Sequence, residues 1–107
     1  MITGENFIEL ALSFPGTIQK PHFERTGFSV IGKTMFATYL AKNNTANIFL
    51  SPKEQIIFCK MDSKNIYPVP NKWGEKGATT FELNKVPKEF VPEALLSAYN
   101  DVIKQKK

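Results

Sequence analysis

The sequence has 107 residues, of which 42% are hydrophobic, 12% aromatic and 22% charged. This length suits one domain, residues 1–107, and so much apolar content excludes an intrinsically disordered chain. The formal net charge is +4, but Lys104, Lys106 and Lys107 supply three of the 14 positive charges, which leaves 11 against 10 acidic residues elsewhere. We therefore expect a nearly neutral folded body, with residues 104–107 as a frayed tail.

The first predicted element is a helix near the N-terminus. Thr3 suits an N-cap, and Phe7, Leu10 and Phe14 recur at helical spacing before Pro15–Gly16 ends the pattern. The apolar stripe of this helix is expected to pack on a sheet.

Residues 23–50 change to the alternation that is typical of strands. Ile31–Thr34 predicts a two-residue hairpin turn with Gly32 at its first central position, where a positive φ is favoured. Asn43–Thr45 predicts the next turn of an antiparallel meander. One face of the strand between these turns is expected to carry Met35, Ala37 and Tyr39, and the other Phe36, Thr38 and Leu40.

A second helix is predicted from a strong local signal. Ser51 caps, Pro52 fits the first helical position and Glu54 completes a capping box, so a short helix should run to about Met61. Residues 63–78 contain two prolines and two glycines, which we interpret as a long loop without a helix or strand.

The last predicted elements are a strand and a helix. Residues 79–83 should form the strand, with Phe81 and Leu83 inward. Pro92 cannot lie deep in a helix, so Pro87–Phe90 is expected to form a separate turn before the final helix. The buried stripe of that helix should comprise Leu95, Ala98, Tyr99, Val102 and Ile103. Together these elements predict an α+β fold with an antiparallel sheet.

Several short motifs follow one another in an order that resembles the MmcQ/YjbR family of small bacterial proteins over nearly the whole chain. They are Phe14–Gly16, Lys20–Phe23, Val30–Ala37, Ser51–Glu54, Tyr67–Gly74, Phe81–Leu83 and Leu95–Tyr99. The resemblance implies a CyaY-like (frataxin-like) two-layer sandwich, in which the N- and C-terminal helices pack on one face of the sheet and a short helix follows the hairpin strands. It also implies a DNA-binding role. Ser51 and Ala78 depart from the family pattern, which has lysine and an aromatic residue there.

The candidate DNA-binding site is a set of lysines around one aromatic residue. A wing-like hairpin carrying a lysine could follow the phosphates of duplex DNA, while the presence of a single arginine, Arg25, argues against extensive base reading. The alternative is that the tryptophan packs over the core and the lysines only solvate the surface. The candidate residues are Lys33, Lys72, Trp73, Lys76, Lys85 and Lys88.

A second hypothesis is a protein-binding or small-ligand-binding module that uses the apolar sheet face and the 63–78 loop. An exposed patch of Phe36, Phe49, Tyr67 and Trp73 would favour it. We expect a monomer that contacts no membrane, because no apolar run approaches the roughly 18 residues that span a bilayer.

The sequence offers no recognisable catalytic or metal-binding set. His22 has only Glu24 nearby on the expected strand face, and the single cysteine, Cys59, lies in an apolar run where a thiol behaves as a small buried hydrophobe. Zinc would need more Cys and His ligands, and Glu5 and Glu9 are too few for an iron-binding acidic ridge. We expect a cytoplasmic protein that is not an enzyme and has no cofactor.

Overall fold

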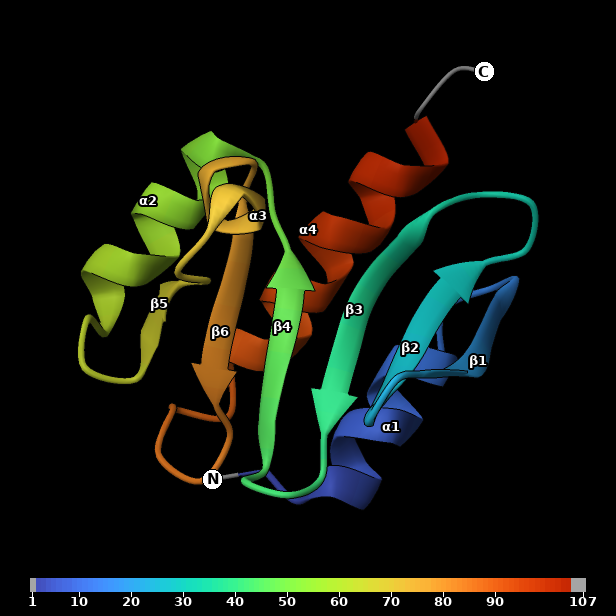
Figure 1. Ribbon diagram of the computed structural model, residues 1–107, viewed down its shortest axis with the longest axis horizontal. Coiled ribbons are helices and arrows are strands. Elements are labelled where there is room, and N and C mark those ends of the chain that lie inside the picture. The colour runs from blue at the N-terminus through green and yellow to red at the C-terminus, as the bar shows by residue number, and fades with distance from the viewer. Residues whose placement is uncertain (1, 105–107) are drawn as a thin grey trace.

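The computed structural model describes residues 2–104 as one six-stranded antiparallel sheet with four helices (Figure 1). The sheet order is β1-β2-β3-β4-β6-β5. The strands are β1 (Thr17–His22), β2 (Arg25–Val30), β3 (Met35–Leu40), β4 (Thr45–Phe49), β5 (Ile66–Pro68) and β6 (Ala78–Glu82). The helices are α1 (Gly4–Leu12), α2 (Pro52–Met61), α3 (Lys72–Glu75) and α4 (Phe90–Lys104).

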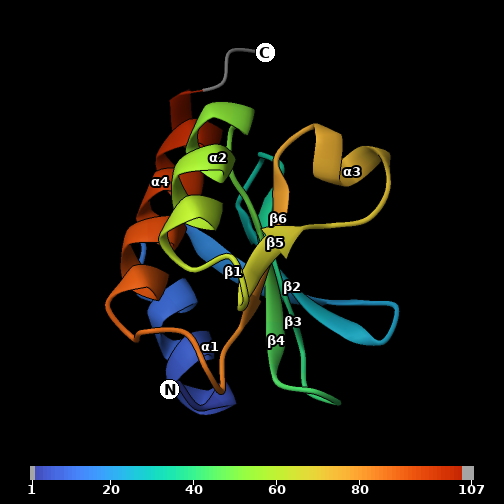
Figure 2. The same ribbon diagram turned by 90° about the vertical axis from the view of Figure 1, so that its left-hand side faces the viewer.

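The helices are distributed unequally over the two faces of the sheet. Figure 2 shows α1, α2 and α4 on one side, and α3 on the other. The turn between β1 and β2 also projects to the side of α3. The predicted α+β class, with the N- and C-terminal helices on one face and a short helix after the hairpin strands, is confirmed. We call the face away from α1, α2 and α4 the open face.

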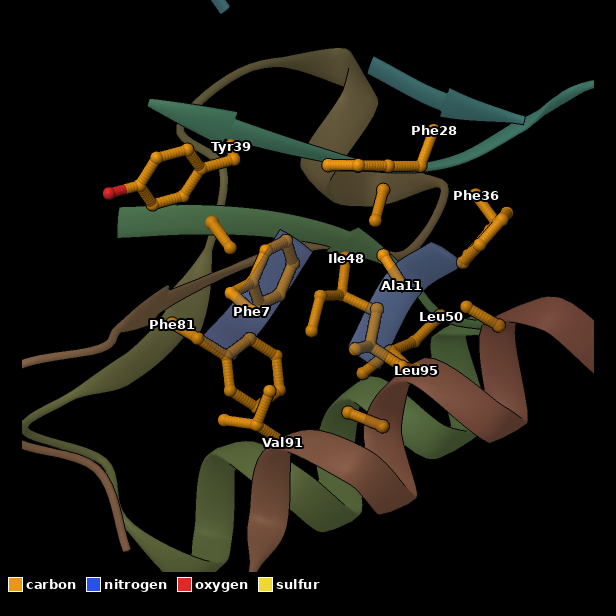
Figure 3. Packing of buried hydrophobic residues seen from close by; sticks show 14 of the residues in the cluster. Phe7, Ala11, Phe28, Phe36, Tyr39, Ile48, Leu50, Phe81, Val91 and Leu95 are labelled. Atoms are coloured by element: carbon orange, nitrogen blue, oxygen red, sulfur yellow. The ribbon is translucent and has the colours of Figure 1, made fainter. Parts of the chain in front are cut away.

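The hydrophobic core lies between the sheet and the three helices on its covered face. Thr3 caps α1 as predicted, because its side chain accepts a hydrogen bond from the Asn6 amide at 3.1 Å. Phe7 of α1 is fully buried and its ring lies 5.9 Å from that of Phe28 and 5.8 Å from that of Tyr39. Figure 3 shows these rings with residues of β4, β6 and α4 in one continuous cluster.

A bulge at the start of β3 changes which side chains enter the core. Phe28 pairs with Ala37 while Ser29 pairs with Met35, so Phe36 is the extra residue. Phe36 consequently faces the helices, where its ring contacts Phe14 and Tyr99. The prediction that Phe36 shares a face with Thr38, and Met35 with Ala37, is wrong because strict alternation fails at the bulge.

The turn before β3 lies one residue earlier than predicted. The Lys33 amide donates to the Val30 carbonyl at 2.8 Å, so residues 30–33 form the turn and Gly32 is its third residue. The positive φ of Gly32, 77°, agrees with the prediction. The turn expected at Asn43–Thr45 lies slightly earlier, at residues 41–44, with Asn44 at a φ of 54°, and Thr45 already begins β4.

Three elements were absent from the sequence prediction. Edge strand β1 was missed because its side chains are mostly polar and it contains Pro21, which is tolerated at an edge. Strand β5 and the single-turn helix α3 occupy the segment that we had interpreted as a loop, 63–78. Both depend on contacts with residues distant in the sequence: β5 pairs with β6, and α3 is bonded to Gln55.

The other helices follow the prediction closely. Ser51 caps α2, with its side chain accepting from the Glu54 amide at 3.2 Å. Helix α4 begins at Phe90, so Pro92 lies in its first turn, after a turn in which the Phe90 amide donates to the Pro87 carbonyl. Ile103 is exposed, so its place on the buried stripe was wrong. Lys104 ends α4, and the rest of the expected tail, 105–107, lies outside the described residues.

Candidate ligand-binding site

The middle of the open face carries a row of polar side chains. Thr38, Asn47 and Thr80 are neighbours across β3, β4 and β6. The Arg25 guanidinium donates to the Thr38 hydroxyl at 3.3 Å, and the Thr80 hydroxyl donates to the Asn47 side-chain oxygen at 2.7 Å. These hydrogen bonds hold the row in one arrangement while leaving other polar atoms able to bind a ligand.

A pocket of about 940 Å³ lies over part of this row, since Thr38 and Asn47 line it. It extends from the β1–β2 turn to α3, the two segments that project on the open side of the sheet (Figure 2), and its lining also includes Asp101 and Val102 of α4. Its lining combines aromatic, cationic and neutral polar groups, including Phe23, Arg25, Thr38, Asn47, Trp73 and Lys76. Asp101 also lines the pocket and supplies a negative charge.

Trp73 presents its indole ring to solvent at one end of the pocket. The side chain is 62% exposed, so the alternative in which it packs over the core is wrong. The Lys76 ammonium lies 5.4 Å from the centre of the ring, which is within the range of a cation–π contact. Asn71 caps α3 by accepting from the Trp73 amide at 2.9 Å. An exposed indole next to an ammonium group is suited to a ligand that is both flat and anionic.

The helix that carries Trp73 is fixed to the body of the protein. The buried Gln55 amide of α2 donates to the carbonyls of Gly74 and Ala78 at 2.9 and 3.1 Å. A Cβ atom on Gly74 would collide with the Val69 carbonyl, and one on Gly77 with the Leu50 carbonyl. Only glycine permits this close backbone packing. Trp73 is therefore held in place without burying its own ring.

Phe23 lies at the other end of the pocket, and no feature of the sequence had suggested it as a site residue. It is the first central residue of the two-residue turn that joins the paired residues His22 and Arg25. Its φ is 60°, a conformation that favours glycine there and costs on the order of 1–3 kcal/mol for a residue such as phenylalanine. Its side chain is 95% exposed, and its ring lies 5.0 Å from that of the adjacent His22. Neither the left-handed backbone of Phe23 nor its exposed ring adds a buried contact to the core.

The structure brings together only part of the predicted lysine set. Lys72 and Lys76 lie beside Trp73, and Lys76 lines the pocket. Lys33 lies in the β2–β3 turn, at the same end of the sheet as α3 but across β4 and β3. Lys85 and Lys88 lie in the segment that follows β6, at the opposite end of that strand from α3 (Figure 1). Glu24 and Glu75 place negative charges near the two aromatic residues.

The titratable groups outside the pocket point to structural roles. Burial raises the pKa of the Cys59 thiol, which disfavours the reactive thiolate. Tyr67 donates to the Glu82 carboxylate at 2.6 Å, and this hydrogen bond, helped by burial and the negative charge, raises the pKa of Tyr67 to about 12. Among residues 2–104, no group of three or more His, Cys, Asp and Glu side chains is placed to hold a metal ion.

None of the helices in the described part of the chain has the length and apolarity needed to cross a bilayer.

The fold is shared with a solved structure. The chain is similar to the crystal structure of Deinococcus radiodurans protein DR2400, a DUF419 domain, with a TM-score of 0.84 and 22% sequence identity. The similarity covers 98% of this chain and 81% of that chain. At this identity it establishes the α+β fold alone. No family model matches the sequence, and no curated protein does.

Proposed function

We propose that this protein is a non-enzymatic, cytoplasmic DNA-binding module whose site is the open-face pocket. The observation that carries the proposal is the exposed Trp73 indole with the Lys76 ammonium beside it, on a helix that is fixed to the core. The resemblance of the sequence to the MmcQ/YjbR family supports the same role.

Two cations in the pocket lining can contact a phosphate backbone. Arg25 and Lys76 line the pocket together with one carboxylate, Asp101. Outside the lining, Lys72 adds a positive charge and Glu24 and Glu75 add negative ones. Lysine and arginine side chains supply most of the sequence-independent affinity for DNA. The site thus contains fewer of the six residues predicted from the sequence: Lys72, Trp73 and Lys76 lie at one end of it, Lys33 flanks it, and Lys85 and Lys88 lie apart.

A salt titration with two matched double variants tests the proposal. Binding of labelled DNA should weaken as salt rises, and Lys72→Ala with Lys76→Ala should reduce the slope of log K against log salt by about 1 to 2. Lys85→Ala with Lys88→Ala removes the same charge at the other end of the sheet and should change the slope less. Equal losses in both variants would mean that overall charge, rather than the pocket, attracts DNA. An absence of binding in low salt would contradict the proposal.

A second candidate is a small-ligand or protein site at the same place. Its support is the pocket volume of about 940 Å³, since small-molecule sites usually measure about 300–1,000 Å³. Of the four rings expected in an exposed patch, Phe36 is buried in the core, and the partly buried Tyr67 does not line the pocket. Trp73 and the partly exposed Phe49 do line it. A thermal-shift screen in which neutral aromatic compounds stabilise the protein and DNA does not would favour this candidate.

A further inference from the structure

Phe23 and Trp73 share an unusual combination of features. Each ring is largely exposed, and each is placed by the backbone rather than by burial of the ring. Phe23 occupies a left-handed conformation in a two-residue turn. Trp73 sits on a helix held by Gln55 and by the close packing of Gly74. Strained or exposed groups on a rigid support are typical of sites prepared for a ligand.

The two rings lie at opposite ends of one pocket. In sheet order, β2, β3, β4 and β6 lie side by side beneath it. Three spacings between neighbouring strands amount to about 14 Å across the sheet. The two rings are also offset along the strands, because the β1–β2 turn lies at the end of the sheet opposite to α3. Stacked nucleotides rise by about 3.4 Å each, so the span across the strands alone suits about four of them and exceeds a mononucleotide.

We infer that the pocket binds a single strand of DNA, with bases stacked on Phe23 and Trp73 and phosphates contacting Arg25 and Lys76. This inference rests on the proposed DNA-binding function and names the form of DNA that the site recognises. Aromatic platforms combined with cations are how proteins bind single strands without strong sequence preference.

The exposed rings distinguish a single strand from a duplex. In a duplex the flat faces of the bases are covered by their neighbours, so a duplex resting on this face contacts the cations and leaves both rings unused. In a single strand the base faces are available for stacking. Thr38 and Asn47, which also line the pocket, offer further hydrogen-bonding groups.

Fluorescence anisotropy with two DNA forms tests the inference. The probes are a labelled oligodeoxythymidine of about 12 nucleotides, within the usual range for one small domain, and a blunt duplex of the same length. The wild-type protein should bind the single strand at least tenfold more tightly than the duplex. Phe23→Gly, which relieves the turn, should weaken single-strand binding about tenfold without lowering the unfolding midpoint, and Phe23→Tyr should restore binding.

Two variants of Trp73 separate stacking from general apolar contact, and a variant of Leu96 is a control remote from the pocket. Trp73→Leu keeps an apolar side chain without a flat ring and should weaken single-strand binding, whereas Trp73→Phe should retain most of it. Leu96→Ala removes an exposed apolar side chain from α4, which lies on the other side of the sheet, and should have no effect.

The outcomes distinguish this inference from the proposed function. Equal affinity for duplex and single strand, or a Phe23→Gly variant that binds the single strand like the wild type, would overturn the inference and leave DNA binding standing. Failure to bind either form in low salt would overturn both.

Discussion

The covered and open faces of the sheet are built from the same strands but differ in the side chains that they carry. On the covered face, Phe28, Ile48 and Phe81 are completely buried beneath the helices. On the open face, Thr38 accepts from Arg25 and Asn47 accepts from Thr80, and both Thr38 and Asn47 line the pocket that also holds two exposed rings. Stability is therefore concentrated on one face, and the features that cost stability without benefiting the fold are concentrated on the other.

The largest expected effect comes from the covered face. Phe81→Ala should lower the free energy of unfolding by about 3–5 kcal/mol, because it opens a cavity beside Phe58, whose ring lies 6.0 Å away. Urea unfolding measures the loss. Thr80→Ala, the next residue along β6 but on the open face, should cost only about 1 kcal/mol through its hydrogen bond to Asn47. Comparable losses in the two variants would contradict the contrast between faces.

A smaller loss of stability is expected at Gln55, which connects α2 on the covered face to α3 on the open face. Gln55→Leu keeps the volume but removes the bonds that hold α3, and should cost about 1 kcal/mol, since the Gly74 and Ala78 carbonyls retain other backbone partners. Trp73 is the only tryptophan, so its fluorescence anisotropy should fall as α3 loosens. Gln19→Leu, at an exposed glutamine, should leave both quantities unchanged. An unaltered anisotropy in Gln55→Leu would mean that α3 does not depend on this amide.

Unlike the variants above, a substitution in the turn at Phe23 is not expected to lower the free energy of unfolding. Phe23→Gly is expected to leave the free energy of unfolding unchanged or to raise it by up to about 1 kcal/mol, because glycine adopts a φ of 60° without strain. Thermal unfolding monitored by circular dichroism provides the measurement. A clear destabilisation would show that the phenylalanine ring supports the fold, and would remove the reason for assigning it to a ligand.

The last expected effect concerns pH and is confined to alkaline conditions. The pKa of Tyr67 is raised from 10.0 to about 12 in the folded protein. The folded state thus holds the phenol proton more tightly than the unfolded state, so this contribution to stability is complete below pH 10 and is lost as the pH rises towards 12. Tyr67→Phe should make the free energy of unfolding decline less over that window. Parallel declines in the two proteins would contradict a role for the Tyr67–Glu82 hydrogen bond.

Local signals in the sequence were sufficient for much of the covered face. The caps at Thr3 and Ser51 and the inward position of Phe81 follow from spacing and residue type within a few positions. The exception is Phe36, which enters the core only because pairing of β2 with β3 shifts the register. A bulge depends on two strands together, and one strand's alternation does not reveal it.

The open-face site could be predicted only in part. Lys72, Trp73 and Lys76 were grouped because they are close in the sequence, but the exposure of Trp73 depends on Gln55, which is distant. Phe23 went unnoticed because β1 is a polar edge strand, and without β1 no turn is expected at residues 22–25. Lys85 and Lys88 were grouped with the site by sequence proximity, although β6 separates them from α3.

Mapping of amide chemical-shift changes by NMR during titration with the single-stranded oligonucleotide tests the central claim most directly. Binding at the open face should shift the amides of Phe23, Thr38, Asn47 and Trp73 in fast or intermediate exchange. The amides of Ile56 in α2 and Leu96 in α4 should stay unchanged, since neither residue lines the pocket and both helices lie on the covered face (Figure 2). Shifts confined to α2 and to the part of α4 around Leu96, with none at the residues that line the pocket, would contradict the assignment of the site.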